Sequence, residues 1–164
     1  MPIATRAALV QGLSEIARNL RPSDEAFILS FSGTLDFQQD LTDDYHLLEN
    51  AVDQIRPQRG SALLDAVSFA AAHLKRIAKN KYRVLLIVSD GDRDAAQSEM
   101  PLSAAVNELR IYCIGLGVDD ESHRSLLQAL ASRTGGGASF IENPEQFETA
   151  TLRVAQEIYR GQPF

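Results

Sequence analysis

The sequence has little cysteine, little positive charge and no long hydrophobic run, and each shortage excludes a class of protein. A single cysteine rules out a disulfide framework within the chain and a cysteine-rich zinc site. The formal net charge of -6 disfavours a nucleic-acid-binding protein, because such proteins usually present a basic face. No window reaches the roughly 18 consecutive apolar residues that a membrane-spanning helix needs.

The first residues show no basic stretch followed by an apolar segment, so we expect no signal peptide. The 164 residues suit a single domain, 1–164, with a core large enough to need no cross-links. Cys113 lies inside an apolar run and is expected to be a small buried side chain. We expect His46, His73 and His123 to be surface or partly buried helix residues, because their spacing does not suit a metal site.

Helical and strand periodicities alternate along the chain, which predicts a three-layer α/β fold with a doubly wound, mostly parallel sheet. One antiparallel edge strand is expected after a hairpin turn at Ser32 and Gly33, with Gly33 at positive φ. Apolar runs predict strands at 26–31, 35–39, 83–89, 111–116 and 138–141. Apolar stripes or helix-start signals predict helices at 5–20, after Thr42, after Ser61, at 102–109, after Asp120 and after Asn143.

In an open parallel sheet, ligands bind beyond the carboxyl ends of the strands, which directs attention to the polar loop after the strand at 83–89. A calcium loop of the EF-hand type is excluded, because Ala95 and Pro101 stand where it needs glycine and an acid. A Mg²⁺-dependent phosphoesterase or Toprim-like nuclease using Asp90, Asp92 and Asp94 remains an alternative. A solvated loop with a helix-capping aspartate is a second one.

Several short motifs occur in a fixed order along nearly the whole chain. They are Phe27 to Ser32 after Asp24 and Glu25, Gly60-Ser61-Ala62-Leu63-Leu64-Asp65-Ala66, Val84 to Asp92 with its Ser-Asp-Gly, Ile114 to Gly117, and Thr134 to Gly137. In this order the chain resembles the von Willebrand factor type A domain, in particular its bacterial branch.

The resemblance implies a protein–protein interaction module of the adhesion type that is not an enzyme. In the family, a metal-ion-dependent adhesion site holds a divalent cation, usually Mg²⁺, which a carboxylate of the partner protein completes. The implied metal ligands here are Ser61 and Asp90, and Asp65 matches a recurrent supporting acid. The expected partner-binding edge also includes Ser32, Gly33, Gly60, Asp92 and Asp94.

The chain departs from the family at one essential motif, because it contains no Asp-x-Ser-x-Ser. Ser61 and Asp90 alone offer one hydroxyl and one carboxylate, whereas Mg²⁺ prefers near-octahedral oxygen coordination. We therefore expect no tightly bound metal, with Mg²⁺ binding only if the missing loop is supplied. A degenerate or truncated module that works without metal is a further alternative. Family members outside the cytoplasm carry export signals, so the compartment stays open.

The same comparison implies that the central N-terminal strand of the family is missing. In the family this strand lies between those that correspond to 26–31 and 83–89. Its absence would leave two apolar strand edges facing a gap, and unpaired strand edges attract other chains. We expect either direct pairing of these two strands or a homodimer formed through their edges.

Overall fold

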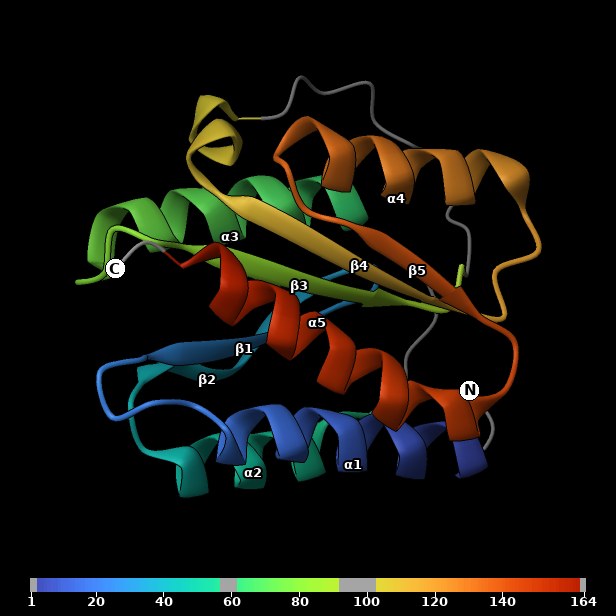
Figure 1. The fold of residues 1–164 in the computed structure, drawn as a ribbon, viewed down its shortest axis with the longest axis horizontal. Coiled ribbons are helices and arrows are strands. Elements are labelled where there is room, and N and C mark those ends of the chain that lie inside the picture. The colour runs from blue at the N-terminus through green and yellow to red at the C-terminus, as the bar shows by residue number, and fades with distance from the viewer. Residues whose placement is uncertain (1–2, 57–61, 92–102, 163–164) are drawn as a thin grey trace.

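The computed structural model describes residues 3–56, 62–91 and 103–162, which form helices packed on both faces of a set of strands (Figure 1). The helices α3 and α4 lie on one side, and α1 and α2 lie on the other (Figure 1). In chain order the elements are α1 (Ile3–Arg18), β1 (Ala26–Phe31), β2 (Leu35–Thr42), α2 (Tyr45–Gln54), α3 (Leu63–Ile77), β3 (Val84–Ser89), η1 (Ala104–Glu108), β4 (Arg110–Leu116), α4 (Glu121–Arg133), β5 (Ala138–Ile141), η2 (Pro144–Gln146) and α5 (Phe147–Gly161). The α/β architecture predicted from the alternating periodicities is confirmed.

The parallel part of the structure has the strand order β3-β4-β5. The β3–β4 register is regular, from Val84 opposite Arg110 to Ser89 opposite Gly115. Strand β4 is buried from Ile111 to Leu116, because helices cover both of its faces. Its apolar residues alternate between two core clusters, with Cys113 on the α3 and α4 side and Tyr112 on the α1 and α5 side.

The antiparallel part is the β1–β2 hairpin, as expected for one antiparallel edge strand. The register shifts twice within β1, between Ala26 and Ile28 and again between Ile28 and Leu29. Gly33 does not have a positive φ, so that prediction is wrong. The turn is instead closed by a hydrogen bond of 2.9 Å from the Ser32 N–H to the Thr34 carbonyl.

The helix boundaries follow their capping residues. The helix expected after Thr42 is capped by Asp44, which accepts from the His46 N–H, while Thr42 accepts from the Asp44 N–H. The helix start expected after Asn143 is confirmed, and Asn143 and Gln146 form a capping box there. A helix is expected at 102–109. The structure describes this segment from residue 103, and it forms there a short 3₁₀ helix, η1.

Strands β1 and β3 belong to two separate sheets, so the expected direct pairing of these strands is wrong. Contacts at the amino ends of the strands set their spacing. The Lys79 N–H donates to Glu25 Oε1 at 2.6 Å, and the Asn80 side chain donates to the Ser23 carbonyl at 3.0 Å. A cleft of about 920 Å³ separates the two strands along their length.

Candidate functional site

The carboxyl ends of β1 and β3 bring two of the predicted site residues to one cleft. Ser32 follows β1, Asp90 follows β3, and both line that cleft. The Ser32 carbonyl accepts a hydrogen bond of 2.8 Å from the Ala62 N–H, which places the loop after β1 against the start of α3. Ser32 is buried, whereas Gly33 and Asp90 are exposed. The predicted residues Gly60, Ser61, Asp92 and Asp94 lie outside the described residues.

The Ser-Asp-Gly motif lies at the carboxyl end of β3. Gly91 has a φ of 75°, a conformation that favours glycine. Its N–H donates to the Ser89 hydroxyl at 3.3 Å. A Cβ at Gly91 would also lie 3.2 Å from the side chain of Val118. Conformation and packing therefore both call for glycine beside Asp90.

A buried hydrogen bond behind this motif was missed by sequence reasoning. The Ser89 hydroxyl lies 3.0 Å from Nε2 of His123, and both side chains are buried. The His123 N–H also donates to the capping carboxylate of Asp120 at 3.3 Å. The helix start predicted after Asp120 is consistent with this hydrogen bond to a backbone N–H. Nothing in the sequence indicates that the His123 imidazole contacts β3. The expectation of surface or partly buried histidines is therefore wrong for His123 and His73 and holds for exposed His46.

The pair of Ser89 and His123 has the residue types of a nucleophile and a base, but its position does not suit that chemistry. The Ser89 side chain is buried and already accepts from the Gly91 N–H. A nucleophile has to reach a substrate carbon or phosphorus atom, which a buried hydroxyl within the fold does not. We interpret the pair as a support that fixes the turn next to Asp90.

The described residues do not form a metal centre. No group of three histidine, cysteine or acidic side chains within 3–56, 62–91 and 103–162 is arranged to hold an ion. Asp36 and Asp90 both line the cleft, whereas Asp65 is exposed on the first turn of α3. Mg²⁺ prefers about six oxygen ligands in octahedral geometry. The donors of the described part therefore do not fit the ion that the family resemblance implies.

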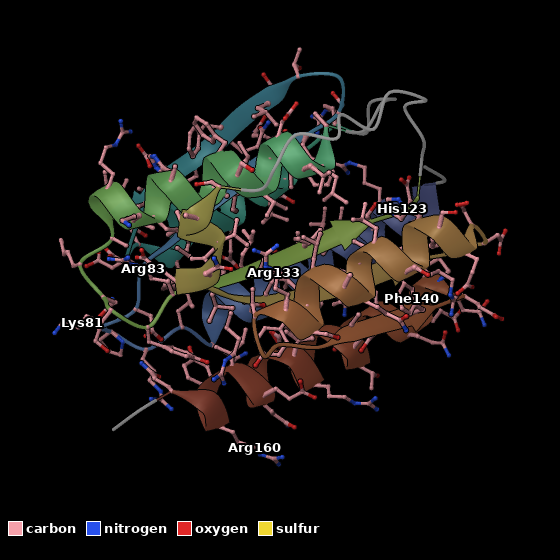
Figure 2. All side chains as sticks on the ribbon, turned by 90° about the horizontal axis from the view of Figure 1, so that it is seen from above. Lys81, Arg83, His123, Arg133, Phe140 and Arg160 are labelled. Atoms are coloured by element: carbon pink, nitrogen blue, oxygen red, sulfur yellow. The ribbon has the colours of Figure 1, made fainter. Side chains whose placement is uncertain are left out.

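Both ends of the strands carry charged side chains. Lys81 and Arg83 lie at the amino end of β3, opposite the end at which His123 lies (Figure 2). Asp90 follows the carboxyl end of β3, and Asp119 and Asp120 follow that of β4. The edge with the candidate site thus carries Asp90, Asp119 and Asp120, whereas the amino end carries the acidic Glu25 and Glu108 beside its basic residues.

The sequence over residues 4–93, more than half of the chain, matches the von Willebrand factor type A domain family. No curated protein matches the chain. None of the described helices has the length and apolar character required to cross a membrane.

Solved structures share the fold at low sequence identity. A von Willebrand factor type A protein from Catenulispora acidiphila has a TM-score of 0.79 at 16% identity, covering 96% of this chain and 39% of that one. An aerotolerance-related membrane protein from Bacteroides fragilis has a TM-score of 0.71 at 16% identity, covering 94% and 88%. The von Willebrand domain of the type V pili tip protein Mfa5 from Porphyromonas gingivalis has a TM-score of 0.71 at 12% identity, covering 99% and 91%. With the family match and this shared fold, the chain belongs to the von Willebrand factor type A domain family.

Proposed function

We propose that this domain recognises another protein through the carboxyl edge of its strands and does not catalyse a reaction. The observation that carries the proposal is the meeting of the loop after β1, the start of α3 and the turn at Asp90 around one cleft. Loops held by a rigid sheet are common binding surfaces. The similar fold in a pilus tip protein supports a role of this kind.

We propose that the metal site of this edge is incomplete in residues 1–164, with Ser61 and Asp90 as its remaining ligands. The edge residues Ser32, Gly33, Gly60, Asp92 and Asp94 would contact the partner. Without a bound cation, the acidic side chains would favour a partner with basic groups over one that offers a carboxylate. A degenerate module of this kind would bind its partner without metal.

Photocrosslinking tests the position of the interface. Gly33 suits a benzoylphenylalanine probe, because a Cβ there meets no atom within 4 Å and φ is not positive. A probe at Lys81, at the opposite end of β3, is the matched control. We expect a discrete crosslinked protein in cells of the native host from position 33 and not from position 81. With that partner purified, Asp90→Lys should weaken binding by about tenfold or more, and Lys81→Glu should not.

Two results would contradict the proposal. One is the same set of crosslinks from both positions, with an affinity that does not respond to Asp90→Lys. The other is phosphatase or nuclease activity that Asp92→Ala abolishes, which would favour the enzyme alternative with Asp90, Asp92 and Asp94.

A further inference from the structure

Strand β2 and helix α3 present two aromatic rings to solvent side by side. Phe37 of β2 is 40% exposed and Phe69 of α3 is 42% exposed, and their ring centroids lie 5.6 Å apart. Single exposed apolar side chains are ordinary on a protein surface, whereas rings in contact form a continuous apolar area. This pair is therefore a candidate contact surface for another molecule.

Two further rings hold the exposed pair in place. The ring of buried His73 lies 4.8 Å from that of Phe37 and 6.0 Å from that of Phe69, nearly parallel to the latter. Phe27 of β1 lies 5.9 Å from Phe37. We call these four side chains the aromatic patch. Because its rings contact one another, a ligand would lose little affinity to the ordering of side chains on binding.

A carboxylate lies beside the aromatic patch because the hairpin is irregular. Residues three apart in a regular strand point to opposite faces of the sheet. Phe37 and Asp40 nevertheless both contact His73, the first through its ring and the second through a hydrogen bond of 2.7 Å. The pairing of β2 with β1 skips Gln38, which lies between them, and an extra residue of this kind reverses the alternation.

A second carboxylate lies on the helix side of the patch. Asp65 and Phe69 are both exposed and are four residues apart on α3, so their side chains are neighbours on the helix surface. None of the ion pairs among the described residues involves Asp65. At the other end Arg76 lies 3.5 Å from Nδ1 of His73. A cation is therefore favoured at the Asp65 end of the patch.

We propose that the aromatic patch binds an arginine side chain of a protein partner, with the guanidinium over the exposed rings and next to the carboxylate of Asp65. Aromatic faces attract cations. Arginine suits such a surface better than lysine, because its planar guanidinium stacks on rings and is more weakly hydrated than an ammonium group. The net charge of -6 also favours the approach of a basic partner.

This inference goes beyond the function proposed above and does not depend on it. The aromatic patch lies on the side formed by β2 and α3, whereas the interface proposed above lies at the carboxyl edge of the strands. The two proposals can therefore fail separately.

The test titrates the protein with a short capped peptide in which two arginines alternate with glycines, followed by NMR of the phenylalanine rings. We expect saturable shifts of the Phe37 and Phe69 resonances at millimolar peptide or below. A control peptide has citrulline for arginine, which keeps the planar shape and removes the charge. It should bind at least fivefold more weakly, and a lysine peptide at least twofold more weakly.

Protein variants locate the site. Phe69→Leu keeps an apolar side chain and removes the ring, so we expect at least threefold weaker binding and loss of the preference for arginine over lysine. Asp65→Asn should weaken binding at low salt by a similar factor. It should match the parent at about 1 M salt, where charges are screened beyond ~3 Å.

Leu152→Ala removes an equally exposed apolar side chain from α5 and is the matched control, which should bind like the parent protein. Circular dichroism melting shows whether each variant is folded. If Phe69→Leu does not fold, the comparison of the three peptides still decides.

Three results would overturn the proposal. The first is equal binding of the arginine and citrulline peptides, and the second is shifts confined to residues outside the aromatic patch. The third is a dimer in light scattering that Phe69→Leu disrupts, which would assign the patch to a second copy of the chain. Peptide binding at the patch without crosslinks specific to Gly33 would refute only the function proposed above and would support this inference.

Discussion

At the residue scale, the buried His73 holds an exposed carboxylate in place. Its Nε2 lies 2.7 Å from Oδ1 of Asp40, while its ring lies near those of Phe27, Phe37 and Phe69. The hydrogen bond from His73 is the main cause that lowers the pKa of Asp40 below its usual value of 3.8. Asp40 on β2 thus gives the buried His73 a hydrogen-bond partner. The helix periodicity of the sequence does not predict this contact.

We predict that Asp40→Asn lowers the free energy of unfolding at pH 7 by less than about 1 kcal/mol, because the carboxylate is exposed. A carboxyl group whose pKa is lower in the folded state stabilises that state above its unfolded pKa. This contribution is lost as the pH falls through the folded pKa. Urea unfolding at several pH values should therefore show the difference between parent and variant shrinking below pH 3.8. A difference that grows on acidification would contradict this account.

The buried state of Cys113 was correctly predicted from its apolar neighbours. The side chain is fully buried in β4, and burial raises the pKa of the thiol to about 12. The sequence sufficed here because a cysteine within a run of branched apolar residues shares their burial. No such local signal marked the contact of His123 with Ser89, since the two residues lie on different elements.

At the scale of elements, the glycines after α4 have unequal roles. Gly135 has a φ of 76° and follows the C-terminal end of α4. At Gly136 a Cβ would collide with the backbone carbonyl of Ile111 in β4. At Gly137 a Cβ would make only an ordinary contact of 3.7 Å with Glu157. Glycine is therefore required at Gly136 because the turn lies so close to the backbone of β4, and not because of the turn conformation itself.

We therefore predict that Gly136→Ala lowers the free energy of unfolding by about 2–3 kcal/mol, because the backbone of β4 cannot move away without disturbing the sheet. Gly137→Ala is the matched control and should change stability by less than about 1 kcal/mol. Chemical denaturation of the parent and the two variants measures both effects. Similar losses in the two variants would show that the collision at Gly136 is relieved locally.

At the scale of the whole molecule, the interrupted sheet also bears on metal binding. Asp90 stands at the carboxyl end of the cleft, and the described residues bring no cluster of three metal-binding side chains to it. The described residues alone would offer a cation there fewer oxygen ligands than Mg²⁺ prefers. On our proposal, the incomplete metal site would lie beside the gap between the two sheets.

We predict that isothermal titration of the chain with Mg²⁺ shows no binding at micromolar concentrations. The same titration with Asp90→Ala provides the baseline, because it removes the remaining carboxylate ligand. Micromolar affinity that depends on Asp90 would show that Ser61 and its neighbours complete the site after all.

The sequence by itself determined the element order, the strands at 26–31 and 138–141, the helix cap at Asn143 and the family. These features depend on local periodicity, capping chemistry and motif order, which a single chain records directly. Only the tertiary structure decided that β1 and β3 stay apart and that Ser89 meets His123. Both depend on contacts between segments distant in sequence, such as the hydrogen bonds from Lys79 and Asn80 to the residues before β1.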